Sequence, residues 1–198
     1  MIPFDPGATE HRFTTRAGTA TLIRPVRVGD AADLHACIRA VVAAGQGVVR
    51  TIEQIPEDHA KLDADLVEWT DGTLNGPRGA RLMCEVLGAA KGPRIIGEAS
   101  IRRMSPRRLR HVAHLSIEVH PGHQGQGVGR ALMHALLAWV KGPDGVGIAR
   151  VDLDVFAVNT RAVNLYRSLG FEIEGTRKRF VRFEDGSYSD DLVMALMV

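Results

Sequence analysis

Hydrophobic positions along the chain follow two different periods, and the two alternate in order. An apolar stripe at every third or fourth position runs over 128–139, and a shorter one covers 162–169. Such spacing places the apolar side chains on one face of a helix. Continuous or alternating apolar runs, which are typical of strands, lie at 111–120 and 149–156. We therefore expect the second half to alternate strands with helices.

The first half contains the same mixture of elements. A strand is expected at 20–26, and a helix from Asp30, a suitable N-cap residue, to Gly45. A second helix is expected from about Pro56 through Trp69. Further strands are expected at 81–87, 94–104, 172–183 and 187–197. The pattern as a whole predicts a mixed α/β protein.

Length and composition indicate one globular domain. With 198 residues, 45% of them hydrophobic, the chain can bury a substantial core. Residues 1–19 are polar and rich in Gly and Thr, so we expect an N-terminal arm followed by a single domain over 20–198. The net charge of +2 is too small to imply a nucleic-acid or membrane partner. Cys37 and Cys84 form no CxxC pair, and neither a secretory signal nor a long apolar run is present, which favours a cytoplasmic protein.

The most informative stretch is a glycine-rich turn between an expected strand and an expected helix. It consists of Gln124, Gly125, Gln126, Gly127, Val128, Gly129 and Arg130. Free backbone N–H groups meet the positive end of a helix there, which suits a diphosphate, and glycine allows a close approach. The GxGxG spacing differs from dinucleotide and P-loop patterns. A tight turn without a ligand is the alternative.

Two separated motifs place this turn in a family context. The first, Q/R-x-x-G-x-G/A, is matched by Gln124, Gly127 and Gly129. The second is matched by Asn159, Ala162, Leu165, Tyr166, Gly170, Phe171 and Gly175. With these motifs the chain resembles the GCN5-related N-acetyltransferase (GNAT) superfamily. The runs 105–108, 111–113, 170–175 and 185–188 are similar to bacterial members that acetylate free L-amino acids.

The resemblance implies a mixed central sheet of about seven strands, mostly antiparallel, with a central splayed parallel pair and about four flanking helices. It also implies acetyl-coenzyme A as the co-substrate. The strands 111–120 and 149–156 would separate and let the pantetheine arm pair with the backbone of Ile117 and Val119. The turn from Gln124 to Arg130 would hold the pyrophosphate. Asn159 would contact the pantetheine or cap the next helix.

The implied chemistry needs a neutral amine, a stabilised oxyanion and a proton for the leaving thiolate. The resemblance assigns Tyr166 as the general acid; a structural aromatic at the edge of the core is the alternative. Glu118 and Asp154 are candidate bases, because carboxylates are costly in otherwise apolar strands unless they are paired or functional. His114 and His120 are alternatives, as is proton loss to water before binding.

The expected acceptor is a primary amine, either a free amino acid or another small amine. Protein or peptide N-acetylation stays open, because the segment 45–73 offers both arginine and carboxylate groups to an acceptor. The alternatives from other classes are a non-catalytic acyl-coenzyme A sensor and a basic RNA-binding module. We do not expect nucleic acid, because no aromatic residues accompany the arginines at 102–110. No residue pattern predicts a metal site, and the apolar last strand predicts a homodimer.

Overall fold

The protein is built on one eight-stranded sheet. The computed structural model describes residues 10–45, 47–70, 79–89, 91–145 and 147–198. The strand order in the sheet is β1-β2-β3-β4-β5-β6-β8-β7. The strands are β1 (His11–Thr14), β2 (Ala20–Pro25), β3 (Gly79–Val86), β4 (Ile95–Arg103), β5 (Val112–Val119), β6 (Arg150–Phe156), β7 (Glu172–Arg182) and β8 (Tyr188–Met197). The α-helices are α1 (Ala31–Ala43), α2 (Ala60–Thr70), α3 (Val128–Lys141) and α4 (Thr160–Ser168).

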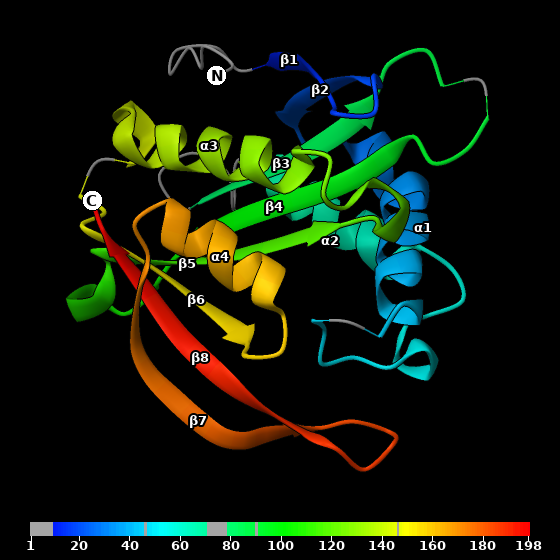
Figure 1. The fold of residues 1–198 in the computed structure, drawn as a ribbon. Helices are drawn as coiled ribbons and strands as arrows, with labels where there is room; N and C mark the ends of the chain where they lie inside the picture. The colour runs from blue at the N-terminus through cyan, green and yellow to red at the C-terminus, as the bar shows by residue number, and fades with distance from the viewer. Residues whose placement is uncertain (1–9, 46, 71–78, 90, 146) are drawn as a thin grey trace.

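Helices cover both faces of this sheet (Figure 1). The pair α1 and α2 lies on one face, and α3 and α4 lie on the other. Because successive strand residues point to opposite faces, neighbours in one strand enter different cores. Cys84 and Ile96 pack with α3 and α4, whereas Met83 and Ile95 pack with α1 and α2. Burial on both faces explains why consecutive residues are apolar at these positions of β3 and β4.

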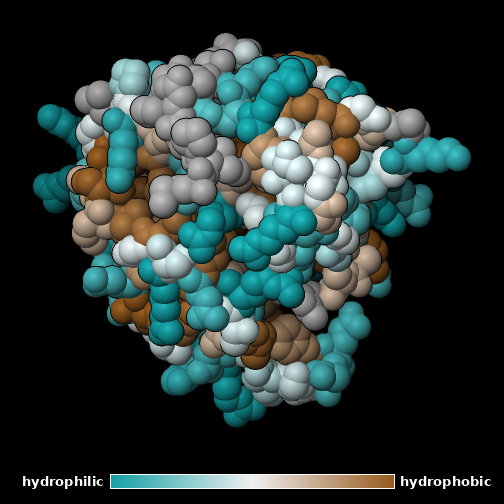
Figure 2. Space-filling view, turned by 45° about the horizontal axis from the view of Figure 1, so that its top comes forward, coloured by the Kyte–Doolittle hydropathy of each residue, from teal (hydrophilic) through white to brown (hydrophobic). Residues whose placement is uncertain are grey.

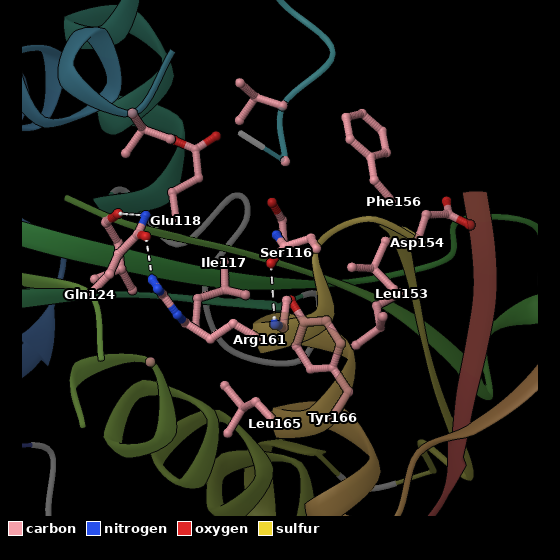
Figure 3. A pocket seen from close by; sticks show the side chains of 18 of the residues that line it. Ser116, Ile117, Glu118, Gln124, Leu153, Asp154, Phe156, Arg161, Leu165 and Tyr166 are labelled. Carbon is pink, nitrogen blue, oxygen red and sulfur yellow. Dashed lines mark hydrogen bonds between the residues drawn. The ribbon is translucent and has the colours of Figure 1, made fainter. Parts of the chain in front are cut away.

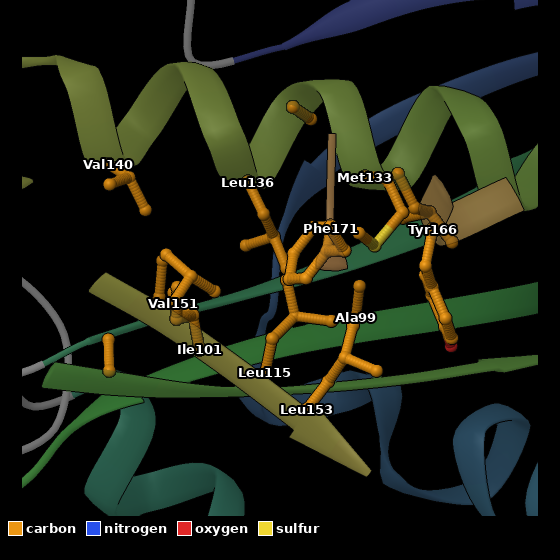
Figure 4. Close-up of a cluster of buried hydrophobic side chains, with 14 of the residues drawn as sticks. Ala99, Ile101, Leu115, Met133, Leu136, Val140, Val151, Leu153, Tyr166 and Phe171 are labelled. Carbon is orange, nitrogen blue, oxygen red and sulfur yellow. The ribbon is translucent and has the colours of Figure 1, made fainter. Parts of the chain in front are cut away.

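The helix α3 buries the stripe that its sequence predicts. Figure 4 shows Leu136 and Val140 pointing from α3 towards Leu115 on β5 and Val151 on β6. Each fully buried aliphatic side chain of this kind contributes about 1.5–3 kcal/mol to folding. The helix ends at Gly142. In the described part of the chain, no helix is long and apolar enough to cross a bilayer.

The central parallel pair, β5 and β6, is in register over a short length only. The paired residues are Val112 with Arg150, Ala113 with Val151, and His114 with Asp152. Beyond His114 the two strands separate, while β5 continues to pair with β4 as far as Val119. The prediction of a mixed sheet with a splayed parallel pair is therefore confirmed.

The N-terminal segment differs from the expected loose arm. Residues His11–Thr14 form β1, which pairs antiparallel with β2 and raises the strand number from about seven to eight. Phe13 is buried in the core on the α3 side, and Thr21 Oγ1 donates to the Phe13 carbonyl at 2.8 Å. The polar composition concealed this strand because only one of its side chains is buried.

The second helix starts later than expected. It begins at Ala60 rather than near Pro56. The Pro56 carbonyl lies 2.8 Å from His35 Nε2 on α1, so this segment is held against α1 through its backbone oxygen.

The surface of the molecule is mixed in character, and Figure 2 shows apolar side chains in several separate patches among hydrophilic ones.

Candidate active site

The separation of β5 and β6 opens into a cavity of about 1140 Å³ (Figure 3). Its walls come from β5 (114–119), the glycine turn, the end of β6 (153–156), the first turns of α4 and the loop at 47–50. The motifs identified far apart in the sequence therefore meet around one space. A cavity of this size, apolar in part and lined by a few polar groups, is typical of a ligand site.

The backbone of β5 beyond His114 faces this opening with groups that pair with no strand in the described part of the chain. His120 N–H donates to the Ile96 carbonyl on β4, at 2.9 Å. Because backbone groups alternate in direction along a strand, those of Val119 and Ile117 point the other way, towards β6. Consistent with this, the Val119 carbonyl accepts from Gln124 Nε2 at 3.1 Å. The structure thus places Ile117 and Val119 as an extended ligand strand would require.

The glycine turn has the conformation that its composition suggests. Gly125 and Gly127 have φ angles of 72° and 97°, a region that glycine adopts without strain. Gly127 is the N-cap of α3, so the first N–H groups of the helix, from Val128 onwards, have no partner within the helix. A Cβ at Gly129 would lie 3.5 Å from Leu165 of α4, which is ordinary van der Waals contact.

The two glutamines of the turn are engaged by the protein itself. Gln124 also accepts from Arg161 Nη1 at 2.6 Å, so its amide links β5 to α4. Gln126 Nε2 donates to the Gly122 carbonyl at 2.9 Å. Their side chains therefore shape the turn, and the groups left for an anion are backbone N–H groups and arginines.

Three arginines surround the turn, of which the sequence pattern indicated only Arg130. Arg130 reaches Ser168 Oγ at 2.9 Å, and Arg161 reaches Gln124. The third is Arg16, from the turn between β1 and β2, whose backbone N–H donates to the Gln126 carbonyl at 3.0 Å and whose Nη1 donates to the Gly125 carbonyl at 3.4 Å. All three line the cavity. Arg16 gave no signal in the sequence because its position depends on the unexpected strand β1.

Asn159 caps α4 as its position predicts. Its Oδ1 accepts from the N–H of Ala162 at 3.2 Å. The loop before Arg50 packs closely on this cap: a Cβ on Gly47 would lie 2.6 Å from Asn159 Nδ2, and Gly47 has a φ of 80°. Glycine is therefore required at position 47 for both space and conformation.

Tyr166 lies at the bottom of the opening. Its ring projects from α4 between Ile117 and Leu153 (Figure 3) and packs against Phe171, with 6.0 Å between centroids. Burial raises the pKa of Tyr166 to about 12, so the hydroxyl stays protonated at neutral pH. It is therefore both a core aromatic and a possible proton donor.

Glu118 is the most perturbed carboxyl group of the cavity. It lies directly opposite Glu98 in the β4–β5 register, and its side chain is 15% exposed. Burial, followed by the charge of Glu98, raises the pKa of Glu118 to about 7, while Arg50, 3.6 Å away, acts in the opposite direction. Its Oε2 is buried with no hydrogen-bond partner among the described residues. A carboxyl group of this kind can take up and release a proton near neutral pH.

Asp154 is held in a different environment, on the β6 side of the cavity. Its Oδ1 lies 2.6 Å from Arg177 and its Oδ2 lies 3.5 Å from His114 Nε2. Arg177 also pairs with Asp191. This carboxylate is therefore held by partners at both oxygens, whereas Glu118 has the longer ion pair with Arg50 and one oxygen without a hydrogen-bond partner among the described residues.

The other candidate groups have structural partners. His120 Nδ1 accepts from the N–H of Gly122 at 3.2 Å, and burial lowers the pKa of His120. Burial raises the pKa values of Cys37 and Cys84 to about 12, so both remain thiols. Of the arginines at 102–110, Arg102 stacks over Trp69 at 4.9 Å. Within the described ranges, no group of three His, Cys, Asp or Glu side chains could hold a metal.

A family model agrees with these observations. The model of the acetyltransferase (GNAT) family matches residues 49–171. The chain therefore belongs to the GNAT family of acetyltransferases, as its two motifs predicted.

Among curated relatives, the N-alpha-acetyltransferase RimI of Mycobacterium tuberculosis is 38% identical over 96 residues, 48% of this chain and 57% of the relative. The L-amino acid N-acetyltransferase AaaT of Escherichia coli is 32% identical over 105 residues, 51% of this chain and 60% of the relative. The aligned regions thus span less than two thirds of the length of these two relatives.

Solved structures agree on the fold. A GNAT acetyltransferase from Streptococcus pneumoniae has a TM-score of 0.78 at 24% identity, with 90% of this chain and 99% of that chain covered. A phosphinothricin acetyltransferase from Sinorhizobium meliloti, solved in complex with acetyl-coenzyme A, has a TM-score of 0.73 at 20% identity, with 89% and 87% covered.

Proposed function

We propose that the protein transfers an acetyl group from acetyl-coenzyme A to the amine of a free amino acid or another small primary amine. The observation that carries the proposal is the meeting, in one cavity, of an unpaired strand edge, an anion-binding turn and a carboxyl group with a pKa near 7. The first two features suit the pantetheine and the pyrophosphate, and the third suits removal of a proton from an amine.

The residues divide the chemistry among them. Glu118, in its carboxylate form, accepts a proton from the ammonium form of the acceptor and leaves a neutral amine. The amine attacks the thioester carbonyl and a C–N bond forms. The nitrogen then loses its second proton to solvent as the C–S bond breaks, which leaves the amide product. An N–H of the β5 edge near Ile117 stabilises the oxyanion. Tyr166 donates its proton to the departing thiolate, and later regains one from solvent.

Asp154 takes a supporting part in this scheme. Its pairing with Arg177 and its approach to His114 keep its charge within a network. Glu118, in contrast, has a raised pKa and a buried oxygen without a hydrogen-bond partner among the described residues. We therefore assign proton removal to Glu118, and to Asp154 the orientation of the acceptor.

N-terminal acetylation of a protein or peptide is the second candidate. Its support is the relative named an N-alpha-acetyltransferase, since the α-amine of a peptide presents the same nucleophile. The non-catalytic sensor remains as an outcome of the test.

The test is acetyl-coenzyme A-dependent thiol release against free amino acids, polyamines, aminoglycosides and short peptides. Calorimetry of coenzyme A binding runs in parallel, and reactions without acceptor subtract the signal of Cys37 and Cys84. Release with small amines supports the proposal, and release with peptides alone supports the second candidate. Binding without release indicates a sensor, and absence of both contradicts the assignment of the site.

A further inference from the structure

The strand β7 contains an irregularity beside the cavity. It pairs with β8 through Arg177 and Asp191, and pairing resumes at Val181 and Ser189. Residues 178–180 of β7 therefore lie opposite Asp190 alone, which is an enlarged β-bulge. Within it, Arg179 has a φ of 50°, which is uncommon for a residue other than glycine.

Asp190 holds this bulge in place. Its Oδ1 accepts from the N–H of Arg179 at 2.8 Å, and its Oδ2 pairs with Lys178 Nζ at 2.8 Å. Backbone conformations of this kind are strained and persist where surrounding contacts fix them, often at functional sites. The conformation of the bulge is thus fixed by specific contacts with Asp190.

The consequence of the bulge is the direction of Phe180. In a regular strand, residues three apart point to opposite faces. Arg177 and Phe180 are three apart, yet both line the cavity, and the guanidinium of Arg177 lies over the Phe180 ring at 4.4 Å. The bulge therefore turns an aromatic ring towards the site.

Phe180 belongs to a wall of apolar side chains at this end of the cavity, which we call the aromatic wall. Phe156 and Phe183 pack edge to face, with 6.2 Å between centroids. Figure 3 shows Phe156 beside Asp154, on the far side of the opening from Glu118. Phe180 is 54% exposed, and the guanidinium beneath it, Arg177, also pairs with Asp154. The aromatic wall comprises Phe156, Phe180 and Phe183, which all line the cavity.

The carboxylates that line the cavity do not suit an acceptor with several amines. Each carboxylate that lines the cavity is already in an ion pair: Glu118 with Arg50, and Asp154 and Asp191 with Arg177. A polyamine or an aminoglycoside would have to displace these arginines. An apolar group, in contrast, would cover exposed hydrocarbon and gain from its removal from water.

We propose that the aromatic wall binds the side chain of the acceptor, so that preferred acceptors carry an aliphatic or aromatic group on the carbon next to the amine, as hydrophobic α-amino acids do. This inference rests on the proposed function and names its substrate class. The bulge at 178–180 contributes to this subsite because it turns Phe180 towards the cavity.

The test compares α-amino acids, which share the α-amine and the carboxylate but differ in the side chain, and adds one polyamine. Steady-state kinetics are measured with L-leucine, L-phenylalanine, L-serine and glycine, and with spermidine as the polyamine. We expect kcat/KM for leucine and phenylalanine to exceed that for serine by about 10- to 100-fold. Phe180→Ala should reduce this ratio by about five- to tenfold without changing KM for acetyl-coenzyme A, and Phe180→Leu should restore most of it.

The matched control is Tyr188→Ala. Tyr188 is an exposed aromatic of the same hairpin that stacks on Arg179 at 4.2 Å and does not line the cavity. This variant should keep the selectivity of the parent protein. Asp190→Ala, which frees the bulge without removing any group of the wall, should lower the leucine-to-serine ratio as Phe180→Ala does.

The outcomes separate this inference from the proposed function. Equal turnover of leucine and serine, preference for spermidine, or unchanged selectivity in Phe180→Ala would overturn the inference while the acetyltransferase assignment stands. Peptides that begin with leucine or with serine form a further arm of the test. If only peptides react, and those with leucine react faster, the result supports the aromatic wall as the side-chain subsite and contradicts a free amino acid as the acceptor. Silence with every amine removes both.

Discussion

Glu118 combines two properties that are seldom found in one carboxyl group: an unpartnered buried oxygen and a position at the edge of a large cavity. With a pKa of about 7, it exists in both forms at neutral pH. As the base it must be deprotonated, so kcat/KM should rise with pH through about 7 and level off above it. Glu118→Gln should lower kcat by about 10²- to 10⁴-fold and abolish this limb.

Arg50 supplies the control for this prediction. Its positive charge lowers the pKa of Glu118 against the effect of burial. Arg50→Gln should therefore move the ascending limb to higher pH and leave the plateau rate largely intact. A pH profile that does not move in this variant, or that persists in Glu118→Gln, would assign the limb to another group.

Tyr166→Phe tests the general acid. The substitution removes the hydroxyl but keeps the ring and its contact with Phe171, so the fold should be preserved. We expect kcat to fall by about 10- to 100-fold, with coenzyme A affinity within about twofold of the parent. Single-turnover rates and calorimetry measure the two quantities, and unchanged turnover would leave Tyr166 with a packing role only.

At the level of residues, the sequence predicted what is local. The glycine turn, the Asn159 cap and Tyr166 occupy the predicted positions because each depends on a few neighbouring residues. The ion pair of Glu118 with Arg50 joins a strand to a distant loop. The pKa of Glu118 also depends on Glu98, which lies opposite it on the neighbouring strand β4. Contacts between segments so far apart leave no trace in a spacing pattern.

Among elements, the hairpin of β1 and β2 changes the view of the cofactor end. It is anchored by Phe13 in the core and carries Arg16 to the glycine turn. Arg16→Gln should raise the Kd for coenzyme A by about three- to tenfold, since one charged hydrogen-bond donor to a phosphate is lost. The measurement is calorimetry at constant ionic strength.

Arg12→Gln is the matched control for this prediction, because Arg12 is exposed on the same hairpin and does not line the cavity. A comparison of coenzyme A with 3′-dephospho-coenzyme A locates the contact. If the effect of Arg16→Gln disappears with the dephospho form, Arg16 acts on the 3′-phosphate, and otherwise on the pyrophosphate. Equal losses in the Arg12 and Arg16 variants would indicate only a general charge effect.

Elements with a strong period were predictable, and those defined by tertiary contacts were not. The stripes of α3 and α4 gave these helices nearly to the residue. The strand β1 was missed because it buries little, and the bulge of β7 because it depends on Asp190 of the neighbouring strand. Both exceptions contribute to the cavity.

For the whole molecule, the apolar composition of the last strand no longer supports the expected homodimer. The apolar last strand, β8, lies between β6 and β7, so its burial within the sheet explains its composition. The edge strands of the sheet are β1 and β7, and no strand in the described part of the chain pairs with the outer side of β7, the longer of the two. We expect association through β7. Sedimentation velocity over the micromolar range tests this, and a monomer at every concentration would contradict it.

The three-residue pairing of β5 with β6 has a mechanical consequence. The two strands are hydrogen-bonded only at their N-terminal ends, so the two parts of the sheet are not joined by hydrogen bonds beyond His114. Pantetheine would supply hydrogen bonds in this gap and would connect the two parts reversibly. Amide hydrogen exchange at Ile117 and Val119 should therefore slow when coenzyme A binds, with slower exchange also at the facing residues of β6. In such an architecture the co-substrate is, for the duration of each turnover, a structural part of the sheet.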